Sequence, residues 1–331
     1  MLEPRGNGMA LHMAPWFSAL QICKRLNIAK SLKLPNAPNL DYHTIDNIAA
    51  TWSSTFREAG HGIIIDQLCD ASGFHAMNLQ VLGCAGGIGG RERLTTCLLL
   101  DDDILLDAGT GLATLEMEQL VKIEHVFLSH SHLDHIAGLA LLADAILGKK
   151  VGPVTIHATD KVMATLKSHF FNWLVWPDFA TIPSAENPVL RWETLEHGVA
   201  VDLGGRSIVA NPVNHSVDAT SYLVRERGAA FLFTGDMSTT PALWEKMKSE
   251  TTLAKVIVDC SFTDADSELA AVSGHYCPRT LQDDIQFMPK STEFLIYHLK
   301  PGQEEIIMQE LKSNAKGRSF EALRCGDRFV F

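Results

Sequence analysis

Short apolar runs separated by Gly, Asp and Pro follow one another from Asn78 to the end of the chain, with longer apolar or amphipathic stretches between them. Short runs bounded by turn-forming residues are typical of β-strands, whereas apolar positions that recur every three or four residues indicate helices. We therefore predict strands at residues 79–82, 96–100, 104–106, 125–128, 154–157, 199–203, 207–212, 221–225, 230–233, 256–258 and 294–296.

Longer segments with helical periodicity lie between groups of these strands. Residues 172–188 are rich in Trp, Pro and Asp, and we predict a loop or lid there. Because strands outnumber helices, we expect an α/β protein in which two sheets pack face to face with helices outside. Strand ends then bring side chains to one edge of this sandwich, where loops carry chemistry. Helices are predicted at residues 136–147, 161–170, 241–248, 279–285 and 303–311.

The N-terminal part of the chain lacks this pattern. Its apolar stretch, residues 14–26, is interrupted by Lys24 and Arg25 and makes a poor signal peptide. Met77 directly precedes the first clear strand, so translation starting near Met77 is an alternative. We predict a loosely ordered N-terminal extension at residues 1–77 and a folded domain at residues 78–331.

Composition and charge exclude some partners. Of 331 residues, 46% are hydrophobic and 20% are charged, which is ordinary for a globular protein. No apolar run reaches the ~18 residues that span a bilayer, so we expect no membrane partner. The net charge of −11 disfavours nucleic acid and favours a small substrate, or an anionic one drawn in by bound metal. The seven cysteines form no CxxC pair, so we expect reduced thiols and a cytoplasmic protein.

The most informative segment is HSHLDH at residues 130–135, which follows a predicted strand and precedes a predicted helix. Imidazoles and a carboxylate at this density suit a transition metal such as Zn²⁺. Side chains two apart in an extended segment project the same way, so His130 and His132 can chelate one ion. Asp134 and His135 lie where the chain turns into the helix, so they can reach a second ion beside the first.

Further ligands must come from other strand ends. His215 is a candidate third ligand for the first ion, Asp236 can bridge both ions, and His298 can complete the second site. A lone His or Asp after a strand is more often a cap or turn residue. With residues 130–135 present, we interpret all three as ligands. Eight other histidines are interpreted as structural or surface residues: His12, His43, His61, His75, His125, His157, His169 and His197.

These residues resemble the metallo-β-lactamase fold superfamily, whose signature is HxHxDH. Within it they look most like the class II 3′,5′-cyclic nucleotide phosphodiesterases, whose signature HxHLDH continues with an aliphatic residue, any residue, and Gly or Ser. HSHLDHIAG at residues 130–138 matches throughout. The sequence departs from the family after His275, where Tyr276 and Cys277 stand for Leu and Thr, and residues 1–77 have no counterpart. Further similar segments are LGCAGG at 82–87, LDAGTG at 106–111, DCSF at 259–262, SGH at 273–275 and YHLKP at 297–301.

The resemblance implies a four-layer αββα sandwich with two Zn²⁺ ions, or Mn²⁺ or Fe²⁺ in their place. A hydroxide that bridges the ions with Asp236 would then open a small-molecule cyclic nucleotide, cAMP or cGMP, to its 5′-monophosphate. Asp134 counts as catalytic as well as a ligand. We interpret His275 as a phosphate contact or proton donor, with orientation of a ligand as the alternative. Trp176, with Trp173 and Phe179, is a candidate for stacking the base; a packed aromatic cluster is the alternative.

Other functions stay open. A tRNA 3′-processing nuclease of the same fold would need a basic arm for RNA, and no Lys- and Arg-rich insertion is present. A thioesterase-like or lactonase branch would not require the SGH and YHLKP segments. A non-catalytic metal-binding relative would have lost ligands, whereas all seven candidates are present. Because some members of the resembling family are exported, a periplasmic location is the alternative to the cytoplasm, and a homodimer is left open.

Overall fold

Residues 76–90 and 93–331 are described by a computed structural model of the chain. The predicted extension at residues 1–77 lies outside them, apart from Ala76 and Met77. Met77 is buried, and its carbonyl accepts a hydrogen bond of 2.9 Å from the Phe331 N–H. Met77 therefore belongs to the folded unit, while the predicted extension before it stays a prediction.

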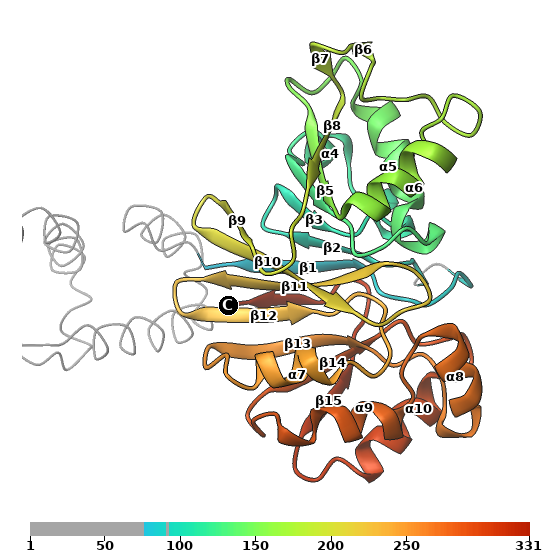
Figure 1. The fold of residues 1–331 in the computed structure, drawn as a ribbon, viewed down its shortest axis with the longest axis vertical. Coiled ribbons are helices and arrows are strands. Elements are labelled where there is room, and N and C mark those ends of the chain that lie inside the picture. Colours follow the sequence, from blue (N-terminus) through green and yellow to red (C-terminus); the bar gives the residue numbers. More distant parts are fainter. Residues whose placement is uncertain (1–75, 91–92) are drawn as a thin grey trace, which may run out of the picture. The chain divides into compact units, whose positions relative to one another are not determined.

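Two seven-stranded sheets pack face to face in the described part of the chain (Figure 1). The first has the order β16-β1-β2-β3-β4-β5-β8 and the second the order β15-β14-β13-β12-β11-β10-β9. First-sheet strands are β1 (Asn78–Gly83), β2 (Cys97–Leu100), β3 (Ile104–Leu106), β4 (His125–Phe127), β5 (Val154–Ala158), β8 (Leu190–Thr194) and β16 (Arg328–Val330). Second-sheet strands are β9 (Ala200–Leu203), β10 (Arg206–Val213), β11 (Ala219–Glu226), β12 (Ala229–Phe233), β13 (Leu253–Asp259), β14 (Glu293–Tyr297) and β15 (Ser319–Ala322).

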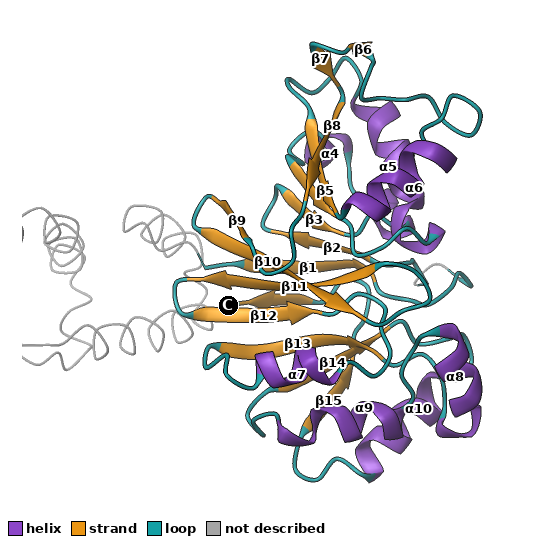
Figure 2. Cartoon of the chain, viewed as in Figure 1, coloured by secondary structure: helices purple, strands orange, loops and turns teal. Residues whose placement is uncertain are grey.

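Helices cover the outer face of each sheet (Figure 2). The first sheet carries α4 (Met117–Leu120), α5 (Leu133–Ile146) and α6 (Asp160–His169), and the second carries α7 (Pro241–Met247), α8 (Ser267–Ser273), α9 (Pro278–Asp284) and α10 (Glu304–Ser313). Short 3₁₀ turns are η2 (Thr110–Thr114), η3 (Asp264–Asp266) and η4 (Ile285–Phe287). The predicted four-layer αββα sandwich is therefore confirmed.

Three apolar layers hold these elements together. One lies between the sheets and includes Phe127, Phe231 and Tyr297, whose exposed fractions are at most 1%. The other two lie beneath the helices of each sheet. Side chains alternate across a strand, so the inner strands supply both an outer layer and the layer between the sheets. This double burial explains why those strands read as nearly continuous apolar runs.

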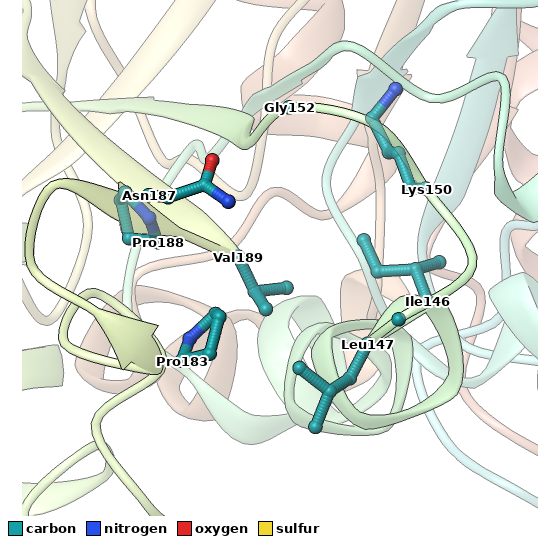
Figure 3. A pocket seen from close by; sticks show the side chains of 9 residues that line it. Ile146, Leu147, Lys150, Gly152, Pro183, Asn187, Pro188 and Val189 are labelled. Carbon is teal, nitrogen blue, oxygen red and sulfur yellow. The ribbon is translucent and has the colours of Figure 1, made fainter.

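The predicted loop at residues 172–188 is largely irregular and contains a small hairpin of β6 (Pro183–Ser184) and β7 (Asn187–Pro188). This hairpin and the C-terminal end of α5 line a cavity of about 230 Å³ (Figure 3). Lys150 lies at the rim of this cavity, and its ammonium group is already paired, because Nζ donates a hydrogen bond of 2.5 Å to Glu124. The cavity lies at the opposite end of α5 from Asp134 and His135, roughly 20 Å along the helix at 1.5 Å per residue.

Within residues 76–90 and 93–331, every helix is too short or too polar to cross a bilayer.

Candidate metal centre

Seven His and Asp side chains converge where strands of both sheets end. The segment between β4 and α5 supplies His130 and His132, and the first turn of α5 supplies Asp134 and His135. His215 follows β10, Asp236 follows β12, and His298 follows β14. Their ligand atoms form two clusters, each with its atoms within 4.8 Å of one another: a first cluster of His130, His132, His215 and Asp236, and a second of Asp134, His135, Asp236 and His298.

The first cluster has nearly the spacing that a tetrahedral ion requires. Ligands ~2.0–2.1 Å from zinc lie roughly 3.3 Å apart in that geometry. Nδ1 of His132 is 3.2 Å from Nε2 of His215, and Nε2 of His130 is 3.8 Å from Oδ2 of Asp236. An ion of zinc's size therefore fits between these atoms.

The second cluster has similar spacing. Nε2 of His298 lies 3.1 Å from Oδ2 of Asp134 and 3.1 Å from Oδ2 of Asp236. Nε2 of His135 lies 3.3 Å from Oδ1 of Asp236 and 3.9 Å from Oδ2 of Asp134. Asp236 thus belongs to both clusters, as a carboxylate shared by two ions would.

Two buried nitrogens in these clusters have no hydrogen-bond partner among the described residues: Nε2 of His130 and Nε2 of His135. A buried polar atom without a partner costs free energy, about 1–3 kcal/mol. Both atoms point at groups whose donors are imidazoles and carboxylates, the ligands that zinc and similar metals take. The residues present therefore fit a metal centre, and their individual roles as ligands stay a prediction.

The protonation of the clusters follows from burial and mutual charge. Burial, reinforced by the His135 ring, lowers the pKa of His130. Burial also acts to lower the pKa of His135, but Asp236 and Asp107 outweigh it and raise that pKa well above the usual value. The pKa of Asp236 is held well below its usual range, because His298 and His135 outweigh burial. A proton and a metal ion therefore compete for His135, and acid weakens metal binding.

Gly235 lets Asp236 approach the loop that carries His130. The backbone of Gly235 has φ +60°, and a Cβ built there would lie 2.8 Å from Cβ of Ser129. A larger residue would strain the turn and push the end of β12 away from that loop. The backbone therefore approaches this loop closely at Gly235 because the residue has no side chain.

Asp107 orients two candidate ligands from behind. Its Oδ2 is 2.7 Å from Nδ1 of His135 and accepts a hydrogen bond of 2.7 Å from the Ser129 hydroxyl. The same hydroxyl oxygen lies 2.9 Å from Nδ1 of His130. Such outer partners set the tautomer and direction of a ligating imidazole. Asp107 lies in the LDAGTG segment at residues 106–111, for which no role was predicted from the sequence.

A matching arrangement supports the second sheet's side of the site. Oδ2 of Asp259 lies 2.7 Å from Nδ1 of His275, and Oδ1 accepts from the Ser261 hydroxyl at 2.5 Å. The Ser261 oxygen is in turn 2.8 Å from Nδ1 of His298. Asp259, His275 and His298 are close enough to one another to be a third set of possible metal ligands. Nδ1 of His275 is already hydrogen-bonded to Asp259, and Nδ1 of His298 to Ser261. We therefore interpret these three residues as support for the candidate metal centre.

His275 itself lies beside both clusters. Its ring centre is 5.0 Å from that of His215 and 5.0 Å from that of His298. Burial acts to lower its pKa, but Asp259 outweighs burial and raises it. With Nδ1 turned to Asp259, Nε2 is the nitrogen left for a substrate. Its role as phosphate contact or proton donor stays a prediction.

The two residues that depart from the resembling family, Tyr276 and Cys277, contact residues outside the two clusters. The Tyr276 hydroxyl donates to Asp284 at 2.5 Å and accepts from Nε1 of Trp244 at 3.0 Å. Cys277 is the N-cap of α9, and its N–H donates to the Thr280 hydroxyl. The Tyr276 departure therefore alters packing between α7 and α9. Cys277 packs instead against Phe262 and Ala270, and the Phe262 ring centre is 5.7 Å from that of His275.

The aromatic residues of the loop at 172–188 have different surroundings. Phe179 is only 3% exposed and belongs to the core beneath α5 and α6, so the suggestion that it stacks a base is wrong. Trp176 packs against the same core, and within the described residues its indole N–H is buried without a partner. Trp173 is 64% exposed. Base stacking by Trp176 stays a prediction.

Two sandwiched sheets with paired His and Asp clusters at the strand ends define a metallohydrolase of the αββα class. Residues 102–303 match the family model described as the Beta-lactamase superfamily domain. This match covers more than half of the chain, and the chain therefore belongs to the β-lactamase superfamily.

Several relatives carry a more specific name. The probable 3′,5′-cyclic-nucleotide phosphodiesterase of Yersinia pestis is 26% identical over 243 residues, which cover 63% of this chain and 68% of that protein. The 3′,5′-cyclic-nucleotide phosphodiesterase of Schizosaccharomyces pombe is 27% identical over 270 residues, covering 66% and 74%. A shorter match, 26% over 165 residues, joins 45% of this chain to half of Ribonuclease BN from Escherichia coli.

Among solved structures, unliganded yeast PDE1 is similar with a TM-score of 0.66. The alignment covers 77% of this chain and 99% of that one at 18% sequence identity. At this identity the likeness speaks for the fold alone.

Proposed function

We propose that this protein is a metal-dependent phosphodiesterase that hydrolyses 3′,5′-cyclic nucleotides to nucleoside 5′-monophosphates. The observation that carries the proposal is the pair of clusters that share Asp236, because a two-ion site suits attack on a phosphodiester. The names of the relatives from Yersinia pestis and Schizosaccharomyces pombe point to cyclic nucleotides as the substrate class.

In this proposal, His130, His132 and His215 hold one Zn²⁺ ion, and Asp134, His135 and His298 hold the other, with Asp236 shared. Two such ions, when bound, supply a water of lowered pKa as nucleophile and positive charge for the phosphate. The chain keeps His130 and His135 directed at the ions through Asp107 and Ser129. Mn²⁺ or Fe²⁺ would take the same donors.

Departure of the 3′ oxygen needs a proton, because an alkoxide is a strong base. His275 is the candidate donor, since Asp259 holds Nδ1 and favours the protonated ring. As the bond between phosphorus and the 3′ oxygen breaks, that oxygen takes the proton from Nε2 of His275. Solvent returns a proton to His275 before the next turnover.

Processing of tRNA 3′ ends is the second candidate, and the shorter match to a protein named Ribonuclease BN favours a ribonuclease. The net charge of −11 opposes it, because RNA binding relies on clustered positive charge. A small cyclic phosphate carries one charge and can be drawn in by the metal centre alone. The charge therefore favours the cyclic nucleotide.

The test is turnover of cAMP, cGMP and a linear phosphodiester, bis(p-nitrophenyl) phosphate, by Zn²⁺-loaded and chelator-treated protein. We expect metal-dependent opening of the cyclic nucleotides, with the 5′-monophosphate identified by chromatography. His275→Ala should lower kcat by about 10²–10⁴-fold, the range for a lost general acid. His169→Ala, in the last turn of α6, is the control and should turn over at the wild-type rate.

Cleavage of a pre-tRNA with no opening of cyclic nucleotides would establish the second candidate instead. Full activity after complete metal removal would refute the two-ion proposal. An unchanged kcat for His275→Ala would exclude His275 as proton donor.

A further inference from the structure

Tyr297 contributes a buried hydroxyl to the metal centre. The side chain is 1% exposed and lies in the apolar layer between the sheets. Its hydroxyl donates a hydrogen bond of 2.9 Å to Oδ1 of Asp236, which is itself 1% exposed. A buried tyrosine hydroxyl needs a hydrogen-bond partner, and here that partner is the carboxylate of a candidate ligand. A phenylalanine would fill nearly the same space without this hydrogen bond.

An unusual backbone conformation lets two consecutive residues reach Asp236. Neighbouring side chains in a strand point to opposite faces, so Tyr297 and His298 should face opposite ways. The strand β14 ends at Tyr297, and His298 has φ +62°, in the left-handed region. The turn brings Nε2 of His298 to 3.1 Å from Oδ2 of Asp236, while the Tyr297 hydroxyl reaches Oδ1. This backbone conformation is strained in a residue other than glycine and persists where other contacts determine it.

The two carboxylate oxygens of Asp236 therefore have different surroundings. Oδ1 accepts from Tyr297 and is 3.3 Å from Nε2 of His135. Oδ2 faces histidines of both clusters: His298 at 3.1 Å, in the second, and His130 at 3.8 Å, in the first. Only Oδ2 is free of a hydrogen bond from the tyrosine while facing both clusters.

We propose that Tyr297 is a positioning residue that turns Asp236 so that one oxygen, Oδ2, is shared by the two metal ions. The inference rests on the metal centre of the proposed function and extends it to a residue outside the ligand set. Without the hydroxyl, the carboxylate can rotate about its Cβ–Cγ bond, and the two clusters lose their common atom. Removal of the hydroxyl should therefore weaken the simultaneous binding of two ions.

Tyr297→Phe tests this directly, and Tyr222→Phe is a matched control. Tyr222 is equally buried in the same layer, and its hydroxyl donates to the Leu128 backbone carbonyl at 2.6 Å rather than to the side chain of a candidate ligand. Zn²⁺ affinity is measured by competition with a chromophoric chelator, and stoichiometry by elemental analysis. Co²⁺ absorption reports the geometry around each ion.

We expect Tyr297→Phe to bind the second equivalent of Zn²⁺ about 10–100-fold more weakly, the effect typical of a lost partner behind a ligand. Its Co²⁺ spectrum should change at two equivalents, while Tyr222→Phe keeps the wild-type affinity and spectrum. Urea unfolding of the metal-free variants checks that both remain folded.

Wild-type affinity for both ions in Tyr297→Phe would overturn the inference, and so would an equal loss in Tyr222→Phe. These measurements use Zn²⁺ and Co²⁺ alone, so they are independent of the substrate. A wild-type protein that binds two ions but opens no cyclic nucleotide would refute the proposed substrate and leave the role of Tyr297 testable. A wild-type protein that binds no second ion would refute the role of Tyr297.

Discussion

Single residues behind the ligands decide how the site is held. Asp107 is fully buried and has φ +59°, a conformation that favours Asn and Asp among residues with a side chain. Its carboxylate reaches His135 directly and His130 through Ser129, so one residue orients a ligand of each cluster. Residue type and backbone conformation are therefore both required at this position.

Asp107→Asn separates the charge from the shape, because Asn tolerates the left-handed backbone. We expect the variant to fold and to bind Zn²⁺ about 10–100-fold more weakly, since His135 and His130 lose their charged partner. Chelator competition measures the affinity, and circular dichroism checks the fold. Unchanged affinity would mean that Asp107 serves only the turn in which it lies.

At this scale the sequence identified the candidate ligands that the fold brings together, and it did not identify the residues that support them. His215, Asp236 and His298 are recognisable because each follows an apolar strand, and a strand end is where a side chain reaches the edge of a sheet. Ser261 and Tyr297 act through hydrogen bonds to residues 37 and 61 positions away along the chain. Such partners are decided only when the chain has folded.

At the scale of elements, the neighbouring strands β4 and β5 carry a pair of histidines, His125 and His157, that lies outside the candidate metal centre. Nδ1 of His125 lies 3.0 Å from Nε2 of His157, and the His157 ring stacks on Phe127. Burial, with a smaller contribution from His125, lowers the pKa of His157 from 6.5 to about 4. The folded protein therefore keeps this ring neutral where the unfolded chain protonates it.

The consequence for stability has a definite sign. The contribution of neutral His157 to the free energy of unfolding is fully present above pH 6.5, and it is lost as the pH falls toward about 4. The loss is on the order of 3 kcal/mol over that window. His157→Gln should flatten the pH dependence of the unfolding free energy, measured by urea titration of metal-free protein between pH 7.5 and 5. His169→Gln should leave it unchanged, and identical slopes in His157→Gln and the wild type would contradict the prediction.

Strands with two buried faces were predicted well, whereas three of the four edge strands of the two large sheets were missed; the fourth edge strand, β9, was predicted. Each strand predicted from the sequence exists, including β13 and β14, because burial on both faces requires a continuous apolar run. The missed strands β8, β15 and β16 are edges of the sheets and are largely exposed. A pairing partner on only one side lets an edge strand keep polar residues, so its pattern resembles that of a loop.

At the scale of the whole molecule, an ion cluster joins the two sheets. Arg206 at the start of β10 donates to both oxygens of Asp103, at 2.5 and 2.8 Å, and to Asp101 at 3.0 Å. Both aspartates lie in the turn between β2 and β3, in the other sheet. The guanidinium is buried and the carboxylates are about one-third exposed, so solvent screens the interaction only in part.

Arg206→Met should lower the unfolding free energy by about 2 kcal/mol, less than the 3–5 kcal/mol of a fully buried pair. Urea unfolding at pH 7 measures the change. Lys122→Met is the matched control, because Lys122 pairs with Asp102 in the same turn at an exposed position and should cost below about 0.5 kcal/mol. Equal losses in both variants would show that Arg206 does not join the sheets energetically.

The chain's own residue order determined the inner strands, the His- and Asp-rich segment at 130–135 and the strand ends that carry further candidate ligands. These features depend on local periodicity and on side chains close together in the chain, which can be read without knowing the fold. Tertiary structure alone decided which side chains lie behind the candidate ligands: Asp107 behind His135, Ser261 behind His298 and Tyr297 behind Asp236. Those relations join residues far apart in the chain, and they arise only when burial brings the strand ends to one edge.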